Sequence, residues 1–226
     1  MPARPAHCRA RVTAVRALAP AILEADLALV EPPALAFDAG QWVSVPFGPK
    51  LVRAYSIAST PRTSSTLTLA ADVAPAGQGS AWFRGLAPGA EVRFKGPLGG
   101  FVFDPADARR PLFVAEEIGI VPIRAMLRDL DEAGVDRDAT LLYWVRDRTW
   151  LVYDDDFREL AVRRRGLSYR PVIGASLADA VAEAAPTVEG LVAYVAGGAA
   201  TINTTRHVLM ARGLDRKSVK WEKFYG

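Results

Sequence analysis

Three residues in the run Arg53-Ala54-Tyr55-Ser56 have side chains that could bind a flat, phosphorylated cofactor. In a β-strand the side chains alternate between two faces, so Arg53 and Tyr55 would project to the same side. A guanidinium group can grip a phosphate with two parallel hydrogen bonds. A tyrosine ring can lie against a heterocycle, and the Ser56 hydroxyl can bond to a ring nitrogen. The combination favours a flavin nucleotide; on these residues alone, the alternative is a surface strand with an incidental arginine.

Two glycine-rich runs follow farther along the chain. The run 76–80, Ala-Gly-Gln-Gly-Ser, contains Gly77 and Gly79, which allow a ligand to approach the main chain closely. We expect Ser80 to open a helical turn whose first N–H groups are free to hold a pyrophosphate. The run 96–101, Gly-Pro-Leu-Gly-Gly-Phe, is typical of a turn that ends a strand.

Taken in order, these runs resemble the ferredoxin–NADP reductase superfamily motifs R-x-Y-S, G-x-x-S and G-P-x-G-x-F. The segment Gly40-Gln41-Trp42 is similar to that family's glycine–glutamine–aromatic step, and the resemblance covers nearly the whole chain. It implies a bound flavin, FAD with FMN as the alternative, with Tyr55 packed on the ring and Ser56 near its reactive N5. The flavin-binding residues that it implies are Arg53, Tyr55, Ser56, Ile57, Gly77, Gly79, Ser80 and Phe224.

The carboxyl-terminal residues resemble the terminal E-x-F-G run of the same family. The resemblance implies that an aromatic ring, Phe224 or Tyr225, stacks on the flavin until a nicotinamide displaces it. It also implies a proton-relay or positioning role for Glu222. Ser56, Glu222 and Tyr225 are therefore the predicted catalytic residues. The alternative is a final β-strand whose aromatic side chains only fill the core.

The chain departs from the family in both nicotinamide loops. In relatives that use NAD(P)H, the sequence of the first loop resembles G-G-T-G-I-A-P. This chain has Glu116 and Glu117 before Gly119 in that loop. One carboxylate about 6–8 Å from a pyrophosphate would repel it by roughly 2–3 kcal/mol at an effective dielectric constant near 20. Relatives resemble Y-x-C-G-P-P in the second loop, where Ala196 replaces the cysteine and Gly197 is kept.

Two interpretations of these loops stay open. NAD(P)H could bind over Gly119 and Gly197 in an altered pose, or the flavin could receive electrons from a protein donor. The two glutamates could also cap a helix N-terminus, where a negative charge is favourable. Arg146 and Arg148 follow the second strand of the α/β half, where a 2′-phosphate would lie, or they are solvated loop residues, so NADH and NADPH are both open.

Composition excludes several other classes of protein. The chain has 226 residues, a net charge of +3, 50% hydrophobic residues, one cysteine and two histidines. No apolar run reaches the ~18 residues that span a bilayer, and the start of the chain does not resemble a signal peptide. We therefore expect a cytoplasmic protein without membrane insertion, and a cysteine-ligated iron–sulfur cluster or a metal site is not expected.

The densest basic run, Arg163-Arg164-Arg165, lacks interleaved aromatic residues, so nucleic-acid binding is not expected. The run is predicted to be a solvated helix end. A basic face that docks an acidic electron-transfer protein is the alternative.

The order of predicted elements divides the chain into two domains. Strands separated by Pro/Gly turns predict an all-β antiparallel flavin-binding barrel over 1–104. Strands alternating with helices predict an α/β doubly wound parallel-sheet nucleotide-binding domain over 105–226. The predicted strands of the barrel are 9–18, 21–29, 42–46, 54–59, 66–73 and 91–95. The predicted elements of the second domain are strands 112–115, 140–145, 168–173 and 191–195 and helices 123–132, 154–165, 177–185 and 201–212, with Gly213 ending the last helix.

The resemblance implies a flavin-dependent oxidoreductase that passes electrons from NAD(P)H to a separate redox protein, such as a ferredoxin or an oxygenase component. Two alternatives stay open. The first is a flavin-binding electron-relay subunit of a larger complex with a degenerate nicotinamide site. The second is a flavin-binding sensor or scaffold without turnover.

Overall fold

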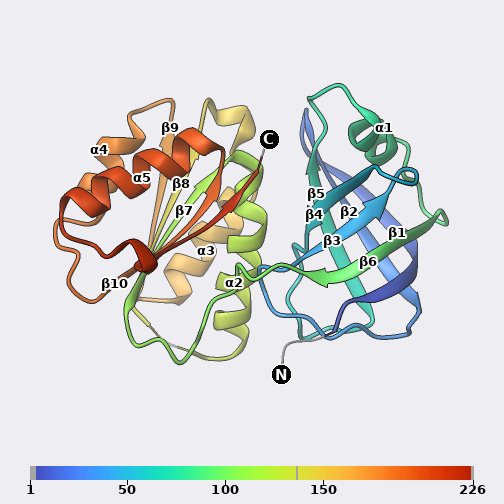
Figure 1. Cartoon of the computed structure of the whole chain (residues 1–226), viewed down its shortest axis with the longest axis horizontal. Coiled ribbons are helices and arrows are strands. Elements are labelled where there is room, and N and C mark those ends of the chain that lie inside the picture. Colours follow the sequence, from blue (N-terminus) through green and yellow to red (C-terminus); the bar gives the residue numbers. More distant parts are fainter. Residues whose placement is uncertain (1–3, 136, 225–226) are drawn as a thin grey trace. The chain divides into compact units, whose positions relative to one another are not determined.

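The computed structural model describes residues 4–135 and 137–224. Contacts within the chain group it into two compact units (Figure 1). The first is Met1–Phe103 with Arg124–Asp129, and the second is Asp104–Ile123 with Leu130–Gly226. Within residues 4–135 and 137–224, no helix is both long and apolar enough to cross a membrane.

The first unit is a six-stranded antiparallel sheet with the strand order β4-β3-β6-β1-β2-β5. An antiparallel bridge between Ile57, just after β4, and Leu69 of β5 joins the two ends of this order and closes the sheet into a barrel. The prediction of an antiparallel barrel is confirmed. The elements are β1 Ala6–Ala19, β2 Ile22–Glu31, β3 Trp42–Pro46, β4 Val52–Ser56, β5 Thr66–Asp72, α1 Gln78–Arg84 and β6 Glu91–Leu98.

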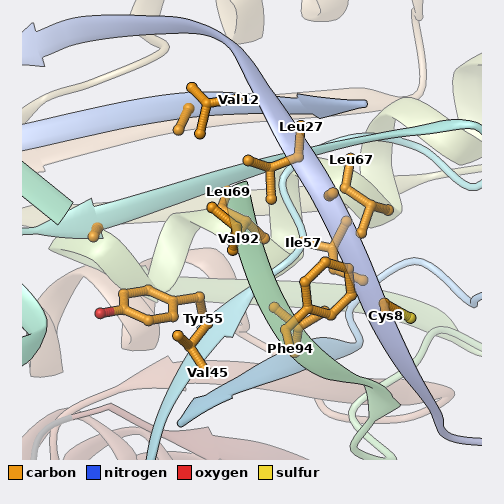
Figure 2. Close-up of a cluster of buried hydrophobic side chains, with 14 of the residues drawn as sticks. Cys8, Val12, Leu27, Val45, Tyr55, Ile57, Leu67, Leu69, Val92 and Phe94 are labelled. Carbon is orange, nitrogen blue, oxygen red and sulfur yellow. The ribbon is translucent and has the colours of Figure 1, made fainter. Parts of the chain in front are cut away.

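Alternating side chains of these strands fill the barrel, as the period of two requires (Figure 2). Each fully buried Leu, Ile or Phe side chain stabilises the fold by about 1.5–3 kcal/mol. The labelled members of this core are Cys8, Val12, Leu27, Val45, Tyr55, Ile57, Leu67, Leu69, Val92 and Phe94.

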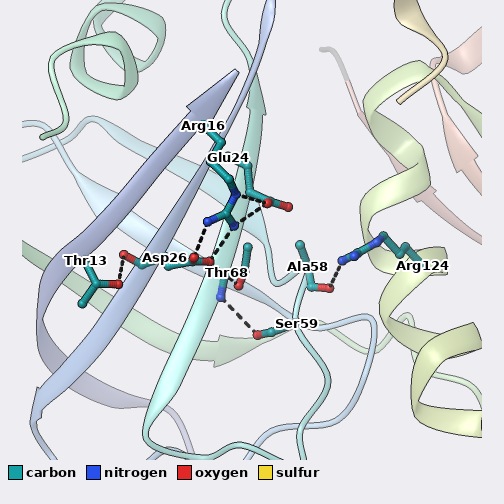
Figure 3. Close-up of polar contacts among 8 residues, drawn as sticks. All are labelled: Thr13, Arg16, Glu24, Asp26, Ala58, Ser59, Thr68 and Arg124. Atoms are coloured by element: carbon teal, nitrogen blue, oxygen red, sulfur yellow. Dashed lines mark hydrogen bonds and ion pairs between the residues drawn. The ribbon is translucent and has the colours of Figure 1, made fainter. Parts of the chain in front are cut away.

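A polar network ties three barrel strands together near the closure (Figure 3). Arg16 of β1 pairs with Glu24 at 2.6 Å and with Asp26 at 2.5 Å, both on β2. The hydrogen bond from Arg16 lowers the pKa of Asp26. Thr68 of β5 donates its hydroxyl to Asp26 at 2.8 Å, and its main-chain N–H donates to the Ser59 hydroxyl at 3.1 Å. The network therefore fixes β5 beside the residues that follow β4.

The second unit is a five-stranded parallel sheet with the strand order β11-β10-β7-β8-β9. The aliphatic side chains of Val181 on α4 and Ile202 on α5 cover one face. Phe157 of α3 contacts the ring of Tyr143 with ring centroids 6.3 Å apart. Tyr143 neighbours Leu142 on β8, and Leu142 belongs to the α4/α5 cluster, so α3 covers the opposite face. The predicted doubly wound architecture is confirmed.

The bounds differ from the predicted ones mainly at element ends. Helix α2 begins at Ile120 rather than Ile123, since Pro122 is tolerated in a first helical turn. Gly213 has φ +95° directly after the C-cap of α5, which confirms its predicted place. The elements are β7 Arg110–Glu116, η1 Glu117–Gly119, α2 Ile120–Glu132, β8 Ala139–Val145, η2 Arg148–Trp150, α3 Asp154–Arg163, β9 Leu167–Ile173, α4 Leu177–Ala184, β10 Leu191–Gly197, α5 Ala199–Ala211, η3 Arg216–Ser218 and β11 Val219–Lys223.

The basic run at the end of α3 is not a solvated helix end throughout. Arg164 is only 9% exposed and donates a hydrogen bond to the carbonyl of Val135. Arg163 pairs with Asp131 at 2.9 Å. Two of the three cations therefore have internal partners, which weakens the interpretation of this run as a free basic docking face.

Candidate functional site

Strand β4 and helix α1 bring Arg53, Tyr55 and Gly79 together. A Cβ atom placed on Gly79 would lie 2.9 Å from the Tyr55 hydroxyl oxygen and 3.1 Å from the Cγ atom of Arg53. The Tyr55 hydroxyl donates a hydrogen bond to the Gly79 carbonyl at 3.2 Å. Arg53 and Tyr55 therefore project to the same side, as their spacing predicts, and position 79 has no room for a side chain.

Aromatic residues of α1 fix the Tyr55 ring. Its centroid lies 5.4 Å from that of Trp82 and 5.5 Å from that of Phe83, and Tyr55 is only 8% exposed. Burial raises the pKa of Tyr55 to about 12, so its hydroxyl is a neutral donor at physiological pH. Trp82 and Phe83 were not predicted as partners of Tyr55, although both lie within three residues after the G-x-x-S motif.

The guanidinium of Arg53 is available to an anion. Arg53 is exposed, and its Nη1 atom donates to the neighbouring Val52 carbonyl at 3.0 Å. In the part of the chain that the structure describes, no carboxylate forms an ion pair with Arg53. Its full positive charge therefore lies beside the first turn of α1 without a protein counter-charge.

The start of α1 differs from the prediction at one residue. Gly77 is the N-cap, the helix begins at Gln78, and Ser80 is its third residue rather than its opening residue. The N–H of Ala81 makes the first intrahelical bond, to the Gly77 carbonyl at 3.0 Å. The N–H groups of Gln78, Gly79 and Ser80 come before that bond, so they have no intrahelical acceptor. A glycine N-cap provides this opening without a side-chain cap.

The other flavin motifs meet through Gln41. Ile57 donates its N–H to the Gln41 carbonyl at 2.9 Å. The Gln41 side chain donates to the Gly99 carbonyl at 3.1 Å and accepts from the Asp38 N–H at 2.8 Å. Ser56, which is buried, lies opposite Trp42 in the β3–β4 register. A single glutamine thus links three motifs that are distant in sequence.

In the second unit, Glu117 is neutralised by Arg146. The two side chains make hydrogen bonds of 2.5 and 2.6 Å, and the Glu117 side chain is 3% exposed. The Arg146 guanidinium carbon lies 4.1 Å from the centre of the Trp150 ring. From the sequence, Glu117 was expected to be an unpaired charge and Arg146 a candidate partner for a 2′-phosphate. In the structure each of these two side chains is the other's ion-pair partner.

Glu116 caps a different helix from the one that follows it. Its Oε2 atom accepts a hydrogen bond of 2.5 Å from the N–H of Gly198, the N-cap of α5. A carboxylate at this end of a helix is favourable by about 0.3–1 kcal/mol. The capping alternative is therefore confirmed for Glu116.

The carboxyl ends of β10 and β11 bring Ala196, Gly197, Glu222 and Phe224 together. Glu222 lies opposite Ala196 in the parallel register, and the N–H of Phe224 donates to the Gly197 carbonyl at 2.9 Å. The Oε2 atom of Glu222 is buried and has no hydrogen-bond partner among residues 4–135 and 137–224. Burial raises the pKa of this carboxyl group to about 7.

The chain end is a strand up to Lys223, and Phe224 follows it, half-buried. Trp221 is 51% exposed, so this ring does not fill the core as the alternative interpretation required. Tyr225, a predicted catalytic residue, lies outside the described residues.

Residues 9–103 match the family described as the oxidoreductase FAD-binding domain. Ferredoxin–NADP reductase B of Sorangium cellulosum is 38% identical over 155 residues, covering 67% of this chain and 64% of that protein. The reductase component of propane 2-monooxygenase from Rhodococcus jostii is 25% identical, covering 96% of this chain and 63% of that protein. The structure of the cytochrome P450 reductase GcoB from Amycolatopsis superposes with a TM-score of 0.87 at 26% identity, covering 98% of this chain and 71% of that one.

The chain belongs to the ferredoxin–NADP reductase superfamily. It spans slightly less than two thirds of the length of these two curated relatives.

Because the chain belongs to this superfamily, its barrel should hold a flavin, and the residues of the barrel fit this cofactor. Arg53 offers a guanidinium that has no ion-pair partner among the described residues, beside the first-turn N–H groups of α1. A Cβ on Gly77 would meet nothing within 4 Å, so the main chain there is open to a ligand. A cationic side chain and main-chain N–H donors next to an open glycine are the groups that bind a pyrophosphate.

The glycines of the nicotinamide loops contact protein rather than open space. A Cβ on Gly119 would lie 2.3 Å from the Ala196 carbonyl oxygen, and one on Gly197 would lie 2.7 Å from the Cβ of Glu116. Packing of η1 against β10 therefore requires glycine at position 119, and packing of the β7 residue Glu116 against β10 requires it at position 197. Their assignment to NAD(P)H stays a prediction.

Proposed function

We propose that this superfamily member is a FAD-dependent oxidoreductase that passes electrons from NAD(P)H to a separate redox protein, such as a ferredoxin or an oxygenase component. The observation that carries the proposal is the convergence of Arg53, Tyr55 and Gly79 in a domain that matches the FAD-binding family. We also propose the division into a flavin domain, 1–104, and a nicotinamide domain, 105–226. FMN would contact the same barrel residues and is the alternative flavin.

In this proposal the chain binds and orients its cofactor. Arg53 and the N–H groups of Gly79 and Ser80 hold the phosphates, while Tyr55 packs beside the ring. Ser56, with Ile57 next to it, presents its hydroxyl near the ring N5. The bound flavin supplies the chemistry, since it accepts a hydride and releases electrons one at a time.

The residues at the ends of β10 and β11 act on the nicotinamide side. Because burial raises its pKa to about 7, the Glu222 carboxyl group can hold a proton at Oε2 near neutral pH. We assign Phe224 or Tyr225 the role of an aromatic cover that a nicotinamide displaces. Ala196 carries no thiol, so no thiol chemistry is assigned here.

One set of absorbance spectra tests the proposal. Purified chain incubated with FAD, then freed of excess, should show a flavin spectrum. Anaerobic addition of NADH or NADPH should bleach it, and the faster of the two identifies the donor. Protein that binds neither FAD nor FMN would refute the proposal.

The internal pairing of both glutamates favours a second candidate, a flavin-binding electron-relay subunit with a degenerate nicotinamide site. Glu117 bonds Arg146, and Glu116 bonds the N-cap of α5, so two groups that could receive a dinucleotide phosphate already have an anion. In this case the flavin would bind but neither nicotinamide would bleach it on a catalytic timescale, whereas dithionite would.

Replacing Arg53 with glutamine should weaken FAD binding by roughly 30-fold, because a charge-assisted phosphate contact contributes about 2 kcal/mol. Flavin fluorescence titration measures the dissociation constant. Arg53→Lys keeps the positive charge but loses the paired N–H donors of the guanidinium group, so its dissociation constant should lie between those of the parent and R53Q. Arg93→Gln, a loss of charge elsewhere on the barrel, should bind FAD as the parent does. An unchanged constant for R53Q would remove Arg53 from the phosphate site.

Replacing Glu116 and Glu117 together with glycine should tighten NAD(P)H binding by about tenfold. The change frees the Arg146 guanidinium and the Gly198 N–H for the dinucleotide, and glycine tolerates the φ of +47° at position 117. The apparent affinity comes from the rate of flavin bleaching against NAD(P)H concentration. Glu189→Gly, which removes an exposed carboxylate before β10, is the control. Equal affinity in the double variant and the parent would mean that the glutamates serve only the fold.

A further inference from the structure

The outer face of the barrel carries a hollow of about 680 Å³ over β1, β3 and β6. This volume lies within the range of small-molecule sites. Its lining includes Arg9, Arg93, Lys95 and Ser44, and it contains none of the residues assigned to the flavin.

The register of β1 and β6 places like charges opposite each other in this hollow. Arg9 faces Arg93 in the antiparallel pairing, and Lys95 lies two residues farther along β6 on the same face. Like charges directly opposite on neighbouring strands destabilise a sheet. A bound anion would relieve that repulsion, so the arrangement fits a ligand of negative charge better than it fits an empty surface.

The carboxylates near these cations are weak competitors. Arg9 lies 3.5 Å from Glu31 and 3.5 Å from Glu91, and Arg93 lies 3.0 Å from Glu91. All of these side chains are exposed, and exposed pairs contribute only about 0–1 kcal/mol. In the described part of the chain, Lys95 has no ion pair. Three permanent cations thus face two carboxylates that a ligand can displace.

One wall of the hollow is apolar. Val52 is 55% exposed there, beside Pro46, and the Ser44 hydroxyl lies opposite Lys95 in the β3–β6 register. An apolar wall next to three cations and a hydroxyl suits a molecule that has an anionic end and an apolar end. We propose that this hollow binds an organic anion that carries a phosphate or carboxylate group on an apolar, ring-sized body.

The test uses the full chain and three naphthalene probes of similar shape. 1-Naphthyl phosphate and 1-naphthoate carry the anion, and 1-naphthalenemethanol does not. Calorimetry with and without excess FAD should show that both anions bind at least tenfold more tightly than the alcohol, with no competition from FAD. The better anion identifies phosphate or carboxylate as the preferred group.

Variants locate the site. Arg93→Gln combined with Lys95→Gln should weaken the anions by at least tenfold. Arg11→Gln removes one charge from β1, two residues beyond Arg9 and outside the hollow, and should change binding by less than threefold. Unchanged FAD affinity shows that each variant is folded. The proposal fails if neither anion binds more tightly than the alcohol, if FAD displaces the anions, or if R11Q weakens them as much as the double variant.

Discussion

Replacing Gly119 with alanine should destabilise the parallel-sheet unit by about 3 kcal/mol, the upper end of the range for overpacking. The added Cβ would lie 2.3 Å from the Ala196 carbonyl oxygen and 2.7 Å from its carbonyl carbon. Both are main-chain atoms of the buried strand β10, so they cannot rotate away as a side-chain tip would. The strand or η1 must shift instead.

Urea denaturation followed by far-UV circular dichroism measures this loss. Gly100→Ala is the matched control, because a Cβ there would meet nothing within 4 Å. FAD affinity should be nearly unchanged in G119A, since the phosphate-binding residues Arg53, Gly79 and Ser80 lie in the other unit. A variant as stable as the parent, with only its NAD(P)H affinity reduced, would show that Gly119 serves the ligand rather than the packing.

This distinction bears on how glycine motifs are interpreted. In a nucleotide loop, a glycine suggests close approach of a phosphate to the main chain. Here the space next to the Gly119 Cα is filled by a neighbouring strand, and that next to Gly197 by Glu116. Both glycines would be required even if no dinucleotide bound, so their presence does not choose between the proposed enzyme and the relay subunit.

Much of the fold was predictable because its patterns are local. Alternation of apolar residues placed the barrel strands, and Pro/Gly turns separated them. The change to alternating strands and helices after Pro111 gave the second architecture. The ends of elements were less predictable, since a residue such as Ile120 joins α2 through packing that neighbouring residues do not reveal.

The site was predictable where a strand or turn fixes geometry, and not where distant charges meet. Arg53 and Tyr55 share a side because strand geometry requires it. Glu117 and Arg146, 29 residues apart, meet only because β7 and β8 are neighbours in a parallel sheet whose carboxyl ends coincide. Nothing near Glu117 in sequence indicates that partner, and a carboxylate without a known partner is naturally interpreted as free.

Replacing Glu222 with glutamine should stabilise the protein at pH 8 by about 2–3 kcal/mol and leave it nearly unchanged at pH 4.5. Burial raises the pKa of this carboxyl group from 4.5 to about 7. Between these values the folded chain therefore binds more protons at this site than the unfolded chain does. The free energy of unfolding falls as pH rises through this window, and the loss is complete above the folded pKa. A neutral amide has no such penalty.

Urea denaturation of the parent and of E222Q at pH 4.5, 6, 7 and 8 measures the difference between them. Glu183→Gln, on the exposed side of α4, is the control and should give a difference that does not change with pH. If the parent and E222Q keep the same difference at every pH, the Oε2 atom has a partner or solvent access that keeps its pKa ordinary. Glu222 would then be ionised at neutral pH, and its proton-holding role next to the nicotinamide would have to be abandoned in favour of positioning alone.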